Sequence, residues 1–143
     1  MPATTNHTSI ERLNRANEGK LPGWLGLEIT HVADGAVEGR LPVRPELVAH
    51  TDYLLAGAVL SVADILCAYG VSTVWPEGAT GCTTAEVKCN FMGAAREGAV
   101  LCKASLLHGG RTTQVWDASL FDETTGRLVA AFRCTQIILY PKT

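Results

Sequence analysis

The segment from Ala56 to about Val74 constrains the fold more than any other part of the chain. Its apolar side chains recur at helical spacing, at Val59, Val62, Ala63, Leu66 and Tyr69. Almost nothing polar stands on the other faces, so a helix here has to be surrounded by protein on most sides. The sequence therefore predicts one long, buried central helix.

Segments with strand character lie on both sides of this helix. The predicted strands are residues 25–32, 36–43, 80–91, 99–107, 112–121 and 128–140. Asp34-Gly35 turns between the first two and predicts a hairpin, and Gly109-Gly110 and Thr124-Thr125-Gly126 mark turns among the later ones. This order predicts an α+β fold in which a hairpin and a meander of strands form one antiparallel sheet wrapped around the helix.

The length of 143 residues fits a single domain, residues 1–143. Residues 1–22 predict an N-terminal helical extension, in which Ser9 caps a short helix through Asn17 and a break follows at Pro22-Gly23. Hydrophobic residues make up 47% of the chain and charged residues 18%, which is more apolar material than a monomer of this size needs. We expect an oligomer that covers the open face or edge of the sheet.

Charge and terminal sequence exclude several partners. The formal net charge is −2 and the twelve basic residues are scattered, so we expect no nucleic acid partner. The start, Met1 to His7, lacks the basic region and apolar run of a secretory signal. The longest apolar tract contains Asp64 and is broken by glycines, so we expect no membrane span and a cytoplasmic protein.

The five cysteines predict neither disulfides nor a metal site. Their number is odd, they are widely separated, and no Cys-x-x-Cys pair occurs among Cys67, Cys82, Cys89, Cys102 and Cys134. Most have apolar neighbours, where a free cysteine behaves as a small buried hydrophobe. We therefore interpret them as core residues in preference to catalytic thiols.

Asp64 is the most informative single residue. It is the sole charged side chain between Ala56 and Val74 and stands in mid-helix, where no capping role explains it. A buried carboxylate is costly, and functional sites are where sequences accept such costs. It can act as a nucleophile on an acyl carbon or as a base that activates water, and the sequence leaves both open. The alternative is that Asp64 and Ser61 simply form a narrow solvated face.

The start of the helix, Leu55-Ala56-Gly57-Ala58, offers a second chemical element. Free backbone N–H groups at a helix N-terminus can stabilise a developing oxyanion, and small residues let a carbonyl approach them. Gly57 is equally compatible with tight helix packing.

A family resemblance connects these features. The run from Leu55 to Asp64 resembles the motif of the PaaI-like (4-hydroxybenzoyl-CoA) hotdog-fold thioesterases, in which His-Gly-Gly opens the central helix and Ala-Asp or Ala-Glu carries the catalytic acid. The segments Thr84–Gly98, Gly109–Thr112 and Gly126–Ala130 resemble later motifs of the family in the same order. The resemblance extends from about Leu25 to the end of the chain.

The resemblance implies a hotdog-fold homodimer, commonly paired again into a homotetramer, that hydrolyses an aryl- or fatty-acyl-CoA at sites shared between subunits. Asp64 would attack the thioester or activate water, and the N–H of Ala56, beside Gly57, would polarise the carbonyl. Thr84 falls where relatives place a hydroxyl that holds the water or the carboxylate across the dimer interface, although an ordinary strand residue fits equally.

Further positions carry over with departures from the family. Arg111 and Thr112 fall where the family contacts the nucleotide end of CoA, which is part of the substrate, and no separate cofactor is implied. Leu55 replaces the family's His and Ala56 its first Gly, while His50 lies near a position that orients the water or leaving group.

Two other functions stay open. One is a hotdog module that binds acyl-CoA without hydrolysing it, which the replacement of the family's His by Leu55 favours. The other is hydration or dehydration of an acyl thioester, which needs a His and an acid on the same substrate, and His50 and Asp64 form the only candidate pair.

Overall fold

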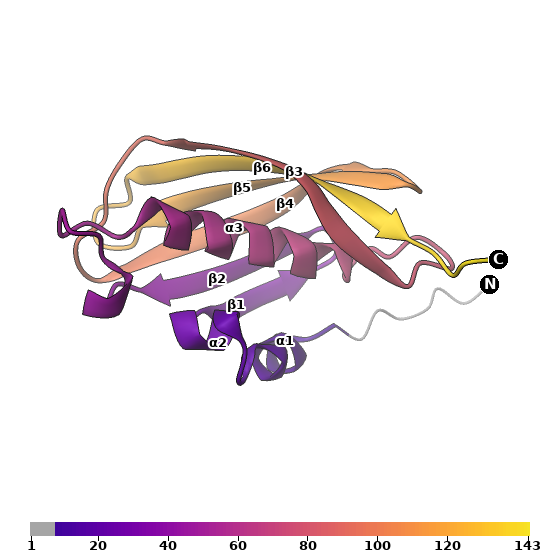
Figure 1. Cartoon of the computed structure of the whole chain (residues 1–143), viewed down its shortest axis with the longest axis horizontal. Helices are drawn as coiled ribbons and strands as arrows, with labels where there is room; N and C mark the ends of the chain where they lie inside the picture. The colour runs from indigo at the N-terminus through magenta and orange to yellow at the C-terminus, as the bar shows by residue number, and fades with distance from the viewer. Residues whose placement is uncertain (1–7) are drawn as a thin grey trace.

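The computed structural model describes residues 8–143, so the first seven residues of the predicted extension, on which the expectation about a secretory signal was based, lie outside the described part. A six-stranded antiparallel sheet curves around one long helix, α3 (Ala56–Val71), as Figure 1 shows. The strands are β1 (Glu28–Ala33), β2 (Ala36–Pro42), β3 (Gly81–Phe91), β4 (Ala99–Gly109), β5 (Thr113–Asp122) and β6 (Leu128–Leu139). The predicted α+β fold is confirmed.

The order of strands across the sheet is β1-β2-β4-β5-β6-β3. The predicted β1–β2 hairpin is confirmed, with Gly35 in the left-handed conformation that its turn requires (φ 75°). The meander is confirmed for β4, β5 and β6. However, β3 does not join it in sequence order: it pairs with β6 at the far edge, while β4 pairs with β2. Turn residues indicate where strands end, but not which strands become neighbours.

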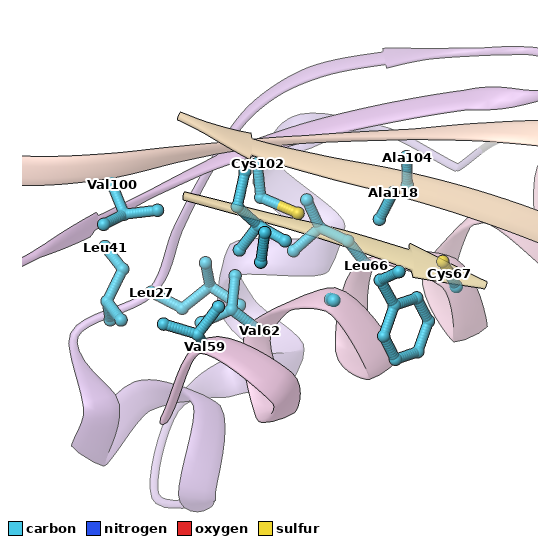
Figure 2. Close-up of a cluster of buried hydrophobic side chains, with 14 of the residues drawn as sticks. Leu27, Leu41, Val59, Val62, Leu66, Cys67, Val100, Cys102, Ala104 and Ala118 are labelled. Carbon is cyan, nitrogen blue, oxygen red and sulfur yellow. The ribbon is translucent and has the colours of Figure 1, made fainter. Parts of the chain in front are cut away.

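The core lies between α3 and the concave face of the sheet. Figure 2 shows Val59, Val62 and Leu66 of the helix against Leu41 of β2 and Cys102 of β4, and all five side chains are buried. Farther along the helix, Gly70 lies against Trp116 of β5, where an added Cβ would stand 2.5 Å from the indole ring. This close approach lets α3 pack directly on the sheet. It also fixes which face of α3 points away from the sheet.

The N-terminal region differs in part from the prediction. Helix α1 (Ile10–Asn17) is capped by Ser9, whose side chain accepts from the N–H of Arg12, as expected. The predicted break at Pro22-Gly23 and strand start at Leu25 are wrong, because a short helix, α2 (Leu21–Leu25), occupies this segment. Proline is tolerated in a first helical turn.

Two further details of the chain path follow from local contacts. A Cβ at Gly23 would stand 2.3 Å from the carbonyl oxygen of Asn17, so glycine permits α2 to pack against α1. A 3₁₀ turn, η1 (Pro45–Leu47), also occurs in the connection before α3.

In residues 8–143, no helix has the length and apolar character needed to cross a membrane.

Helix α3 ends at Val71, three residues before the predicted end near Val74. The hydroxyls of Ser72 and Thr73 donate to the carbonyl oxygens of Tyr69 and Gly70, each at 2.6 Å. Such local hydrogen bonds compete with continuation of the helix.

Candidate active site

Asp64 lies in the middle of α3 and points toward the edge strand β3. The hydroxyl of Thr84 on β3 donates a hydrogen bond of 2.8 Å to Asp64 Oδ1. Asp64 is half-buried, and no cationic side chain in residues 8–143 forms an ion pair with it. The carboxylate is thus held by one neutral donor and is not neutralised by a countercharge.

Ser61 does not share this environment. Its hydroxyl donates instead to the carbonyl oxygen of Gly57 at 2.7 Å, one turn earlier in the helix. Ser61 and Asp64 therefore form separate hydrogen bonds, and both side chains are partly exposed.

The charge of Asp64 acts on three nearby thiols, those of Cys67, Cys82 and Cys134. The pKa of the Cys67 thiol is raised, first by its hydrogen bond with Cys134, then by burial, and to a smaller degree by the nearby charges, including that of Asp64. Burial raises the pKa of Cys82, and the charge of Asp64 adds to that effect. Cys67 and Cys82 therefore stay protonated near neutral pH, whereas hydrogen bonds, first with Cys67 and then with Gln136, lower the pKa of Cys134.

Thr84 accepts a hydrogen bond from a residue that the sequence analysis did not identify. The side-chain amide of Gln136 on β6 donates to Thr84 Oγ1 at 2.9 Å, and Gln136 is completely buried. A signal was present in the sequence, because Gln136 stands in a run of alternating apolar residues that all face the core, after Phe132 and Cys134. Its partner Thr84 contacts the carboxylate of its own chain.

The N-terminus of α3 presents unused donors. Ala56 and Gly57 are exposed, and Leu55 at the N-cap position provides no side-chain hydrogen bond. The first N–H group of this turn with an acceptor in residues 8–143 is that of Ala58, which donates to Leu55 O at 2.9 Å. The N–H groups of Ala56 and Gly57 are therefore available to a ligand carbonyl.

Packing within the chain does not explain the glycine in this turn. A Cβ at Gly57 would contact only the side chain of Leu55, at 3.7 Å. The small residue keeps the approach to the backbone donors open.

Within one chain, the predicted site residues are too far apart to act on one substrate carbonyl together. Asp64 follows Ala56 by eight residues, which corresponds to about 12 Å along a helix axis. One thioester carbonyl cannot contact both groups of the same helix. His50 is exposed in the loop before α3 and forms neither a hydrogen bond nor an ion pair with Asp64 in the described residues.

Arg111 and Thr112 lie in the β4–β5 turn, toward the other end of the helix (Figure 1). The Arg111 guanidinium stands 5.4 Å from the centre of the Tyr140 ring, and the Tyr140 hydroxyl donates to Arg111 O. Arg111 also lines a cleft of about 360 Å³ that includes Val74, beyond the C-terminus of α3. Thr112 O accepts from the N–H of Ile138 at 2.9 Å.

The candidate residues thus form three groups in one chain. His50, Ala56 and Gly57 lie at the start of α3, Asp64 and Thr84 at its middle, and Arg111 and Thr112 near its end.

The sequence pattern of the thioesterase superfamily matches residues 52–129, which include α3, Asp64 and Thr84. The chain belongs to the thioesterase superfamily. This finding confirms the predicted hotdog-fold thioesterase family and, with it, the enzyme class of thioester hydrolase.

Individual relatives agree with the superfamily. The chain is 33% identical to the 1,4-dihydroxy-2-naphthoyl-CoA hydrolase of Escherichia coli K12 over 138 residues, which cover 92% of this chain and 95% of the relative. It is 27% identical to the proofreading thioesterase EntH of Cronobacter turicensis, over 93% and 96% of the two chains. The crystal structure of a mutant thioesterase PA1618 from Pseudomonas aeruginosa superposes with a TM-score of 0.87 at 26% identity, covering 93% of this chain and 95% of that one.

Proposed function

We propose that this thioesterase hydrolyses acyl-CoA, with Asp64 as the group that attacks the thioester or activates water. The observation that supports this most strongly is the half-buried carboxylate in mid-helix, held at one oxygen by Thr84 and without a cationic partner in residues 8–143. Oδ1 is engaged by Thr84, and no described residue donates to Oδ2. An unneutralised oxygen of this kind is a competent base or nucleophile.

Two balanced routes use this oxygen. As a base, Asp64 takes a proton from water while the water oxygen attacks the thioester carbon, and the C–S bond then breaks to release CoA as a thiolate that is reprotonated. As a nucleophile, Asp64 attacks the carbon itself, expels the thiolate and forms a mixed anhydride, which water cleaves to free acid. Both routes pass through a tetrahedral oxyanion, which needs a hydrogen-bond donor.

We propose that a second subunit supplies that donor. The N–H groups of Ala56 and Gly57 are free, yet they stand about 12 Å along the helix axis from the Asp64 of their own chain. A complete site therefore pairs the carboxylate of one subunit with the helix N-terminus of its partner, in a homodimer or in a homotetramer built from two such dimers.

The edge strand β3 is the surface we assign to this pairing. It is the outermost strand beside β6 and carries Thr84, so a partner docked there would approach the carboxylate. Exposed apolar residues on or just after the strand are Val87, Phe91 and Met92, with exposed fractions of 41%, 46% and 52%. An edge of this kind, with a row of unpaired backbone groups, favours association.

For the acyl group we propose an aryl acid. The 33% identical relative from E. coli is named as a hydrolase of an aromatic acyl-CoA. Leu55, 52% exposed beside the free N–H groups of α3, offers an apolar surface where the family usually has a His. Arg111 is proposed to bind a phosphate at the nucleotide end of CoA, because its guanidinium is exposed and directional.

The direct test is the release of free CoA, measured with a thiol reagent over a panel of aryl-, short-chain and long-chain acyl-CoAs. We expect turnover, with the highest kcat/KM on an aryl-acyl-CoA. Binding of CoA with no turnover across the panel would favour the non-hydrolytic module instead. Hydration of an enoyl-CoA, measured as the loss of its ultraviolet absorbance, would favour the hydratase instead.

A further inference from the structure

Gln136 and Gln114 are two buried glutamines in the concave face of the sheet. They stand directly opposite each other on β6 and β5, and Thr84 on β3 stands opposite Gln136 on its other side. Directly opposite residues on one sheet face have their Cβ atoms about 5 Å apart, so their side chains can form a continuous row. The hydrogen bonds of the two amides differ, and this difference indicates different roles.

Gln114 has structural partners only. Its Nε2 donates to Val74 O at 3.2 Å, and its Oε1 accepts from the indole N–H of Trp116 at 2.9 Å. The Gln114 amide thus provides hydrogen-bond partners for Val74 O and for the Trp116 N–H, as is usual for buried polar atoms.

Gln136 is satisfied on one side only. Its Nε2 donates to Thr84 Oγ1 at 2.9 Å and contacts Cys134 Sγ at 3.4 Å, whereas Oε1 is buried with no hydrogen-bond partner in residues 8–143. An orphaned buried acceptor costs stability. An apolar side chain of the same shape would avoid that cost. Stability of the fold therefore does not explain why an amide stands at this position.

The direction of the hydrogen bonds explains why an amide is present. A threonine hydroxyl has one hydrogen to donate. Thr84 uses it on Asp64 Oδ1 at 2.8 Å, so toward Gln136 it can only accept, and Nε2 is the atom that faces it. With Gln136 as donor, the Thr84 hydroxyl is held with its hydrogen aimed at the carboxylate.

Strand geometry adds a second, independent observation. The pairing of β3 with β6 shifts register between Thr84 and Glu86, which is the mark of a β-bulge. Bulges bend a strand locally and re-aim side chains, and they occur often beside active sites. The irregularity begins at Thr84, the residue of β3 that hydrogen-bonds to Asp64.

We propose that Gln136 is a positioning residue for Asp64, acting through the hydroxyl of Thr84. It touches neither substrate nor the reacting atoms. It fixes the donor that holds Oδ1, so that Oδ2 stays directed toward water or the thioester carbon. This inference rests on the proposed function only for its kinetic consequences, because the hydrogen-bonded chain itself can be tested without turnover.

The test uses Gln136→Met, which keeps the length and lack of branching of the side chain but removes the donor and the orphaned oxygen. We expect kcat to fall about three- to tenfold, the loss that corresponds to one neutral hydrogen bond, with KM within twofold of wild type. The melting temperature should not fall. Gln114→Met is the matched comparison for stability and should melt lower, because it leaves Trp116 Nε1 and Val74 O unsatisfied.

A double variant separates positioning from a general packing effect. In Thr84→Val/Gln136→Met, we expect kcat to equal that of Thr84→Val alone, because Gln136 has nothing to act on once the hydroxyl is gone. Wild-type turnover by Gln136→Met, or independent losses that multiply in the double variant, would overturn the inference.

A measurement without turnover keeps the two proposals distinct. The ¹³Cγ resonance of Asp64, assigned by its disappearance in Asp64→Asn, should shift in Gln136→Met and in Thr84→Val at the same pH. An unchanged resonance in Gln136→Met contradicts the positioning role. Failure of the wild-type protein to hydrolyse any acyl-CoA contradicts the proposed function alone.

Discussion

Among single residues, the proposed chemistry of this thioesterase depends on which polar groups the apolar interior leaves unpaired. In residues 8–143, Asp64 keeps an uncompensated charge with a single neutral donor, Thr84. Cys82, Cys89 and Cys102 show the opposite arrangement, since burial raises the pKa of each thiol. Burial raises the pKa of Cys102, and its hydrogen bond with Cys134 together with burial raises that of Cys67.

Raised thiol pKa values predict a loss of stability at alkaline pH. Because the folded-state pKa of Cys102 lies above the unfolded value of about 8.5, its contribution to stability is complete below that pH and is lost as pH rises toward the folded value. We expect the urea midpoint to fall above about pH 9. Cys102→Ala should be less stable at neutral pH but show a flatter alkaline decline. An equally steep decline in both proteins would assign the effect to other groups.

At the scale of elements, α3 combines two functions that require different surfaces. Near its C-terminal end, Gly70 is pressed against Trp116, while at its first turn a Cβ on Gly57 would meet the Leu55 side chain at an ordinary contact distance of 3.7 Å. The same substitution at these two positions should therefore have opposite outcomes.

Gly70→Ala should destabilise the protein by about 1–3 kcal/mol or more, because its Cβ would stand 2.5 Å from the Trp116 ring. Gly57→Ala should be neutral or stabilising by up to about 1 kcal/mol, because its Cβ has no contact closer than 3.7 Å and alanine favours helix. Urea denaturation measures both. Equal stability of the two variants would mean that α3 does not lie on β5 as described.

The sequence predicted most elements because their signals are local. Apolar spacing identified α3 and alternation identified the strands, but the helix α2 was missed, since Pro22-Gly23 has the same composition in a break as in a helix start. The place of β3 beside β6 was also missed, because pairing depends on contacts between distant segments. For the candidate site, Asp64 was evident from its isolation, whereas the polar Gln136 in an apolar run gave a signal whose meaning depends on its contact with Thr84.

In the assembled protein, each proposed site requires two chains. The carboxylate and the free N–H groups of α3 belong to the same helix but are too far apart to serve one carbonyl. The pairing can be tested by removing each half separately.

Ala56→Pro removes one N–H at a position where proline suits the first turn of a helix, and Leu55 before it already has the extended backbone that proline requires (φ −61°, ψ 133°). We expect Ala56→Pro and Asp64→Asn each to lose most activity alone. Mixed subunits should regain a substantial fraction, because one site per mixed dimer contains both native halves. Verified subunit exchange without recovery would contradict a shared site.

The proposed role of Asp64 is tested by the turnover of Asp64→Asn on the best acyl-CoA of the panel. The amide keeps the size of the side chain but is neither a strong nucleophile nor a base. We predict that kcat falls about 10²- to 10⁴-fold while the circular dichroism spectrum and the sedimentation mass match those of wild type. A folded Asp64→Asn variant that hydrolyses the thioester at the wild-type rate would contradict the account.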